Sequence, residues 1–103
     1  MADPLTILAI TTAKPGMTAA LRAAQEQLVA ETLKEEGCLS YALHQSLDDE
    51  HVLIFVESWA SEGLWRAHMD GAAMQRFRET GAGDYFADFS LHRLKHVAGG
   101  PVA

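Results

Sequence analysis

The fold is decided by residues 51–59, which read His-Val-Leu-Ile-Phe-Val-Glu-Ser-Trp. Successive side chains of a β-strand point to opposite faces. One face would therefore carry Leu53, Phe55, Glu57 and Trp59, and the other would carry Val52, Ile54, Val56 and Ser58. β-branched and aromatic residues dominate both faces, as is typical of strands. We expect a strand here, with one carboxyl group on an otherwise apolar face.

The segments on either side place this strand third in a βαββαβ order. Before it, we expect a strand at 5–13 with apolar residues on both faces, a turn at 14–16, a helix at 17–36, a strand at 38–46 and a connection at 47–50. After it, we expect two helices and a last strand at 85–94. The first of these helices would be capped by Ser61 and run through Met69, and the second would be capped by Asp70 and ended by Gly81 and Gly83. This order is typical of the ferredoxin-like split βαβ fold. It is an α+β fold in which helices cover one face of a four-stranded antiparallel sheet.

Side-chain spacing predicts which residues of these segments face the core. The inner stripe of helix 17–36 would consist of Leu21, Ala24, Leu28, Thr32 and Leu33, with Gly37 as the left-handed residue after the helix. Strand 38–46 would place Leu39, Tyr41 and Leu43 on one face and Cys38, Ser40, Ala42 and His44 on the other. Ala73, Met74 and Phe77 would point inward from the last helix, and the last strand would place Phe89 and Leu91 on one side and Phe86 on the other.

Composition limits the classes of protein and of site. The 103 residues predict one domain over residues 1–103, with its core at about 5–96 and a flexible tail at 97–103. A formal net charge of -6 disfavours binding to nucleic acid. The one cysteine excludes disulfide frameworks and multi-cysteine metal sites, and no His spacing matches a zinc motif, so no metal is expected. No signal peptide or membrane-length apolar run is apparent, so we expect a cytoplasmic protein with no membrane partner.

The side of the sheet away from the helices is predicted to be apolar. It would carry Leu8, Ile10, Val52, Ile54 and Val56. A soluble monomer rarely exposes a contiguous apolar surface of that size. A small domain also leaves a large share of its surface in contact with water. We therefore expect a homodimer in which two copies pack sheet to sheet.

Three polar side chains are candidates for chemistry on the helix-covered side. Glu57 and Trp59 are two residues apart on one strand, so they point the same way. His68 lies one helical turn beyond Leu64, so both would face the sheet. A buried carboxyl, an indole N–H and an imidazole in one cavity would suit proton transfer from a weak acid such as a phenol. The alternative is that all three are structural, as buried Trp and lone His residues commonly are.

Several motifs together resemble a known family. They are Lys14-Pro15-Gly16, the run Leu33-Lys34-Glu35-Glu36-Gly37-Cys38 leading to Tyr41, Glu57-x-Trp59 and Leu64-x-x-x-His68. In this order they resemble the antibiotic biosynthesis monooxygenase (ABM) family, with the small quinol monooxygenase-like proteins as the nearest branch. The resemblance spans about residues 6–94. It implies a dimeric α+β barrel with one pocket per subunit between sheet and helices.

The resemblance also implies an activity. Family enzymes oxygenate quinols or aromatic polyketides with molecular oxygen and no flavin, metal or other prosthetic group. We therefore expect a cofactor-independent monooxygenase acting on a small aromatic, phenolic or quinol substrate. Glu57, Trp59 and His68 would be catalytic, and substrate would contact Tyr41, Phe55, Leu64, Met74 and Phe77. Two alternatives stay open: a non-catalytic dimer that binds a small ligand, and a haem-binding or haem-degrading protein with His68 as axial ligand.

Overall fold

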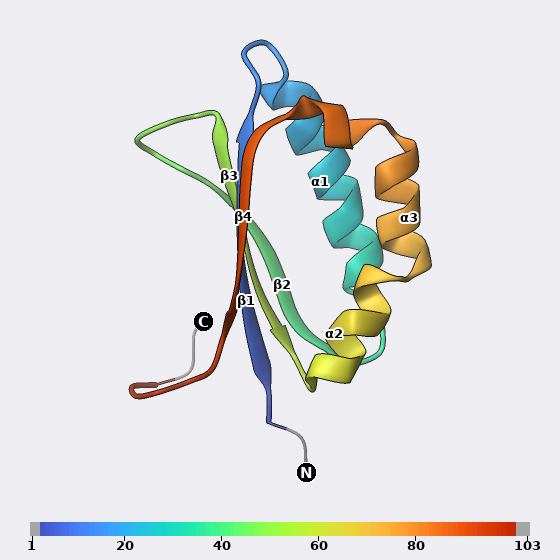
Figure 1. Cartoon of the computed structure of the whole chain (residues 1–103), viewed down its shortest axis with the longest axis vertical. Helices are drawn as coiled ribbons and strands as arrows, with labels where there is room; N and C mark the ends of the chain where they lie inside the picture. Colours follow the sequence, from blue (N-terminus) through green and yellow to red (C-terminus); the bar gives the residue numbers. More distant parts are fainter. Residues whose placement is uncertain (1–2, 101–103) are drawn as a thin grey trace.

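A computed structural model describes residues 3–100, which form one antiparallel sheet with helices on one side (Figure 1). The elements are β1 (Leu5–Ala13), α1 (Thr18–Thr32), β2 (Cys38–Gln45), β3 (Val52–Trp59), α2 (Glu62–Met69), α3 (Ala72–Glu79), the 3-10 helix η1 (Ala82–Tyr85) and β4 (Phe86–Leu94). The strand order is β2-β3-β1-β4. The predicted ferredoxin-like α+β fold is confirmed. Residues 101–103 of the predicted tail lie outside the described residues.

Strand β3 lies inside the sheet, where β1 and β2 pair with it. Every second side chain, from Ile7 onward in β1 and from Leu53 onward in β3, points toward the helices and is buried there. The core on this side includes Ile7, Leu53 and Phe55 from the sheet and Leu21 and Leu28 from α1. Alternating burial along both strands follows from the two-residue period of a strand. The predicted faces of residues 51–59 are therefore confirmed.

Helix α1 ends at Thr32, and not at Glu36 as the sequence pattern predicted. After Thr32 the chain tightens, because the amides of Lys34 and Glu35 each bond a carbonyl three residues back. Leu33 consequently turns outward and is 56% exposed, so its place in the inner stripe was wrong. Gly37, with φ +82°, has the left-handed conformation that was predicted for it.

The caps of the two short helices differ in how well they were predicted. Ser61 caps α2 as expected, since its Oγ accepts a hydrogen bond from the Leu64 amide at 3.2 Å. Asp70 does not cap α3; it ends α2, and Gly71 is the residue that precedes α3. A Cβ at Gly71 would lie 3.0 Å from the Ala67 carbonyl oxygen, so little room exists for a side chain where α2 meets α3.

Two β-bulges shift side chains to faces that simple alternation did not predict. Leu39 is an extra residue opposite β3, so Cys38 and Tyr41 both face the core and Leu39 is 59% exposed. Ala87 is likewise extra opposite β1, since Thr12 pairs with Asp88 and Ala13 with Phe86. The bulge brings Phe86 to the same side as Phe89, and their rings stack with centroids 5.9 Å apart. The predictions that Leu39 shares a face with Tyr41 and that Phe86 and Phe89 lie on different sides of the sheet were wrong.

None of the helices within residues 3–100 lies on the other face of the sheet (Figure 1). Leu8, Ile10, Val52, Ile54 and Val56 lie there in adjacent strands, each half-buried. Strand pairing sets Leu8 opposite Val56 and Ile10 opposite Ile54, so these side chains form one continuous surface, called the bare face below.

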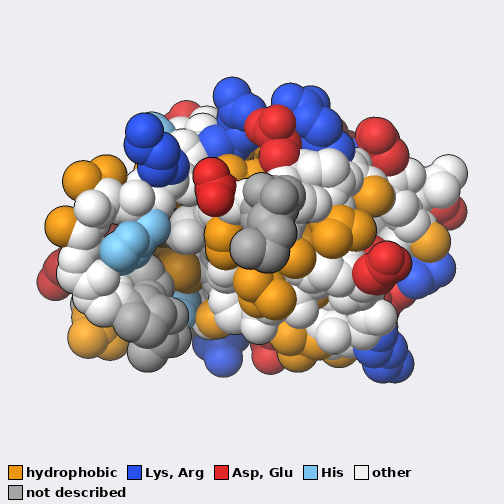
Figure 2. All heavy atoms as spheres, turned by 90° about the horizontal axis from the view of Figure 1, so that it is seen from below, with side chains coloured by type: hydrophobic (Ala, Val, Ile, Leu, Met, Phe, Trp, Pro, Cys, Tyr) orange, Lys and Arg blue, Asp and Glu red, His pale blue; other side chains and the backbone are white. Residues whose placement is uncertain are grey.

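The lower end of the molecule differs in composition from this sheet surface. Figure 2 shows the lower end, where acidic, basic and hydrophobic side chains are interspersed. Within residues 3–100, no helix has the length and apolar character required to cross a membrane.

Candidate active site

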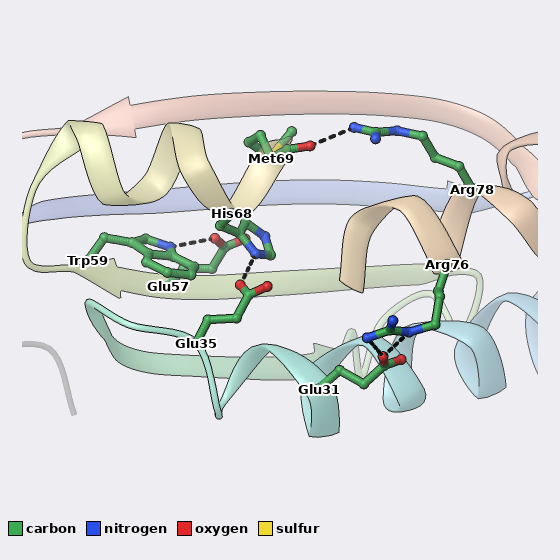
Figure 3. A network of polar contacts seen from close by, with 8 residues as sticks. All are labelled: Glu31, Glu35, Glu57, Trp59, His68, Met69, Arg76 and Arg78. Atoms are coloured by element: carbon green, nitrogen blue, oxygen red, sulfur yellow. Dashed lines mark hydrogen bonds and ion pairs between the residues drawn. The ribbon is translucent and has the colours of Figure 1, made fainter. Parts of the chain in front are cut away.

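Glu57 and Trp59 form a buried hydrogen-bonded pair at the end of β3. The indole Nε1–H of Trp59 donates to Oε1 of Glu57 at 3.0 Å, and both side chains lie on the helix-covered face (Figure 3). Burial raises the pKa of Glu57 to about 7, although the bond from Trp59 works against this shift. The carboxyl therefore holds its proton over a range in which an exposed carboxyl has lost it.

His68 reaches the same region from α2 and is paired with Glu35. Its Nδ1 lies 2.5 Å from Oε1 of Glu35, and its side chain is 1% exposed (Figure 3). Burial lowers the pKa of His68, and the hydrogen bond and charge of Glu35 oppose that shift. A carboxylate can only accept a hydrogen bond, so Nδ1 carries the proton. The neutral ring then presents Nε2 as a lone-pair acceptor, as a general base requires.

Glu35 is a site residue that the sequence analysis did not single out. It lies in the turn between α1 and β2, which is tied to the end of β3 by a hydrogen bond from the Ala60 amide to the Gly37 carbonyl at 2.9 Å. Gly37 also packs directly against Leu64 of α2. These contacts place Glu35 opposite His68. The available signal was a glutamate two residues before Gly37, in a segment predicted to end a helix. This pattern indicates a turn but does not identify the partner of the glutamate.

Aromatic rings enclose the imidazole. The ring centroid of Trp59 is 4.7 Å from that of His68, and Tyr41 meets His68 edge-on at 5.5 Å. Burial also raises the pKa of Tyr41, so its hydroxyl stays protonated. Apolar walls of this kind keep water away from the imidazole and strengthen the electrostatic interactions around it.

A cavity of about 380 Å³ opens beside these groups. Of the residues predicted to contact substrate or to act in catalysis, six line it: Tyr41, Phe55, Glu57, His68, Met74 and Phe77. Trp59 and Leu64 do not line it. Trp59 is fully buried behind Glu57, and Leu64 covers Gly37. Trp59 therefore contacts the cavity-lining side chains of Glu57 and His68 but does not line the cavity itself.

Polar groups at the cavity also include residues that the pattern did not reveal. Gln25 of α1 donates from Nε2 to the Thr11 hydroxyl at 3.0 Å, and that hydroxyl donates to the Leu53 carbonyl at 2.7 Å. Both Gln25 and Thr11 line the cavity, as does Arg78 of α3. Gln25 occupies the inner stripe four residues after Leu21, and this spacing was the signal that could have identified it. Among residues 3–100, no three His, Cys, Asp or Glu side chains converge as metal ligands would.

Comparison with known proteins identifies the family of this chain. The family model described as antibiotic biosynthesis monooxygenase matches residues 4–80. The chain belongs to the antibiotic biosynthesis monooxygenase family. The matched residues include Glu35, Glu57, Trp59 and His68, whereas β4 lies beyond them. No curated protein matches the chain.

Solved structures share the family's fold over nearly the whole chain. PA3566 from Pseudomonas aeruginosa is 33% identical, with a TM-score of 0.87, and the match covers 95% of this chain and 98% of that one. Rv0793 from Mycobacterium tuberculosis is 23% identical with a TM-score of 0.86, over 96% of this chain and 100% of that one. A structure named antibiotic biosynthesis monooxygenase is 21% identical with a TM-score of 0.84, over 91% and 99% of the two chains. The last two show a common fold alone.

Proposed function

We propose that this protein is a cofactor-independent monooxygenase that oxidises a small phenolic, quinol or related aromatic substrate with molecular oxygen. One observation carries the proposal: a neutral imidazole held by Glu35 and a carboxyl held by Trp59 face the same apolar cavity. Pairs of titratable groups with pKa values shifted in opposite directions are typical of acid–base sites. Membership of the monooxygenase family supports oxygen as the co-substrate.

The proposed reaction begins with proton transfer to Nε2 of His68. Loss of the proton raises the electron density of the substrate, which itself reduces oxygen. For an anthrone, the ring carbanion gives its electrons to O₂ and forms a carbon–oxygen bond, and the proton returns from His68 to the peroxide. Cleavage of the O–O bond then releases water and leaves a ketone. One oxygen atom enters the product and the other leaves as water, so no external reductant is needed.

Glu57, Trp59 and Glu35 have distinct roles in this scheme. The protonated Glu57 carboxyl donates a hydrogen bond to the oxyanion that develops on the substrate. Trp59 positions Glu57, and Glu35 positions His68 and selects its tautomer. On sequence grounds Glu57 could orient either His68 or the substrate hydroxyl, and this scheme assigns it to the substrate oxygen because the hydrogen-bond partner of His68 is Glu35.

The size of the cavity favours a small ring compound. A volume of about 380 Å³ lies near the lower end of the ~300–1,000 Å³ common for small-molecule sites. That size supports a substrate of two or three fused rings over a haem macrocycle. The non-catalytic alternative shares this cavity but gives no role to the shifted pKa values of Glu57 and His68.

Oxygen uptake distinguishes these functions. We expect the protein to accelerate oxygen consumption by members of a panel of hydroquinones and anthrones, and His68→Ala to reduce that rate roughly a hundredfold or more. Ligand-induced thermal stabilisation without oxygen uptake would support the binding dimer instead. A Soret band on adding micromolar hemin, lost in His68→Ala, would support the haem-binding alternative.

We further propose that the protein works as a homodimer joined through the bare face. That face presents a continuous row of aliphatic side chains across the two inner strands, and no element of residues 3–100 covers it. Sheet faces of this kind are stable when buried against a second apolar layer. A second copy supplies a layer of matching shape because the same row occurs on each chain.

A further inference from the structure

Arg78 differs from the other arginines because it has no carboxylate partner in the part of the chain that the structure describes. The chain has five arginines and a formal net charge of -6. Four of them form ion pairs: Arg22 with Glu26, Arg66 and Arg93 with Glu62, and Arg76 with Glu31. Arg78 has no acidic partner within residues 3–100. In a chain with an excess of acidic groups, this leaves one guanidinium available for another anion.

The position of Arg78 directs that charge toward the cavity. It lines the cavity, and its Nη2 donates to the Met69 carbonyl at the end of α2 at 2.9 Å. A guanidinium has five N–H donors, so this bond leaves most of them free. Arg76, on the same helix, extends the other way and pairs with Glu31 of α1 (Figure 3). Arg78 thus bridges α3 and α2 at the rim of the site.

The charges of the cavity walls make Arg78 the permanent cation there. Glu57 holds its proton up to about pH 7, and burial lowers the pKa of His68, which favours its neutral form. The remaining walls are mainly aromatic and aliphatic. The charge of Arg78 also lowers the pKa of His68. An anion bound to Arg78 would offset that charge and make His68 a stronger base.

We infer that the natural substrate carries a planar anionic group, such as a carboxylate, which pairs with Arg78 while its reacting hydroxyl lies at His68. Arginine recognises carboxylates through two parallel hydrogen bonds, which fix orientation as well as affinity. The placement of the hydroxyl rests on the proposed function. The recognition of the anion by Arg78 does not, because it requires no turnover.

Binding of two matched ligands tests the inference. Titration calorimetry would compare 6-hydroxy-2-naphthoate with 6-hydroxy-2-naphthamide, which have nearly the same shape and differ in charge. We expect the carboxylate to bind about tenfold more tightly than the amide, because hydrogen bonds between a guanidinium and a carboxylate are stronger than those to a neutral amide oxygen. In Arg78→Met the ratio should fall close to one. Arg76→Gln is the control, because it removes an equal charge from the same helix and should keep the ratio.

The results distinguish a failure of this inference from a failure of the proposed function. Equal binding of the two ligands, no binding of either, or an unchanged ratio in Arg78→Met would overturn the inference. Oxygen uptake with neutral hydroquinones would still support the monooxygenase in each of those cases. Conversely, a preference for the carboxylate that depends on Arg78, without oxygen uptake on any substrate, would support the inference and contradict the proposed function. Thermal melting of both variants checks that they are folded.

Discussion

Glu57 makes the stability of the protein depend on pH. The folded-state pKa of about 7 lies above the ordinary value of 4.5, so between these pH values the folded state binds the extra proton. Stability therefore falls as pH rises through this window, by about 3 kcal/mol for a shift of this size. A glutamine at this position keeps an oxygen for Trp59 but does not ionise. We expect Glu57→Gln to gain stability relative to the native protein from pH 4.5 to pH 8.

Chemical denaturation of the two proteins at several pH values measures this difference. His68 is present in both, so its own titration cancels to first order when the two curves are subtracted. If the curves run parallel, Glu57 has an ordinary pKa and the proposed neutral carboxyl is wrong.

Glu35 is predicted to set the tautomer of His68. In Glu35→Gln the charged acceptor is lost, so the Nδ1–H form is less favoured and the pKa of His68 falls further. Nitrogen-15 NMR of the imidazole reports both quantities directly. We expect turnover to fall by about a hundredfold, within the range that acid–base catalysis contributes.

Glu36→Gln is the matched control for this variant. Glu36 is the adjacent residue in the same turn and is exposed to solvent. The Glu36→Gln variant should leave the nitrogen-15 resonances of His68 unchanged. Identical resonances for native protein and Glu35→Gln would contradict the positioning role.

The residues of the candidate site were not equally predictable from the sequence. The strand period placed Glu57 beside Trp59, and the helical spacing from Leu64 placed His68 toward the sheet. Both placements follow from local periodicity. Glu35 is 33 residues from His68 and lies in a turn whose geometry depends on the early end of α1. Local patterns carry no signal for such a contact.

At the scale of the elements, the periods and caps predicted most boundaries, and the bulges accounted for the misplaced strand residues. A bulge inserts one residue into a strand without altering its composition, so Leu39 and Ala87 look like ordinary members of their strands. Each bulge nevertheless shifts the side chains beyond it to the other face. The second one brings Phe86 into the wall of the cavity, which alternation alone would have placed outside.

Gly37 is the contact point between two parts of the site: the turn that contains Glu35 and helix α2, which contains His68. A Cβ at Gly37 would lie 2.5 Å from Cδ1 and 2.7 Å from Cβ of Leu64, and the residue has φ +82°. Leu64 Cβ cannot move away without moving α2. We expect Gly37→Ala to destabilise the fold by roughly 3 kcal/mol or more, from left-handed strain of about 1–2 kcal/mol and overpacking of about 1–3 kcal/mol.

Gly81→Ala is the control, since Gly81 has φ +83° but nothing within 4 Å of the added Cβ. It should show the strain alone, about 1–2 kcal/mol. Urea unfolding of both variants gives the comparison. Equal losses of stability would show that the contact between Gly37 and Leu64 does not hold the turn against α2.

At the scale of the whole molecule, apolar residues on both faces of the inner strands predicted two apolar surfaces as well as the fold. One face packs against the helices and contains the cavity, and the other is the bare face. The apolar residues of the inner strands thus form two surfaces. The sequence pattern could locate both, but it could not supply the shape of the cavity, which depends on the bulge in β4 and on the turn after α1.

The proposed dimer makes a prediction about its own dissociation. A charge at Ile54, in the middle of the bare face, would be buried without a partner in the dimer, so Ile54→Lys should shift the protein to a monomer. Leu47→Lys adds the same charge in a fully exposed connection and should leave the dimer intact. Light scattering after size-exclusion chromatography measures the mass. A native protein that elutes at 11.2 kDa would contradict the dimer.

The central claim is that His68, held by Glu35, starts the transfer of one oxygen atom from O₂ to an aromatic substrate. Incubation of anthrone under ¹⁸O₂, followed by mass spectrometry of the anthraquinone, tests it most directly. The account predicts product with one ¹⁸O atom, formed well above the uncatalysed rate by the native protein and close to that rate by His68→Ala. Formation of anthraquinone at the same rate with native protein, His68→Ala and no protein would contradict it.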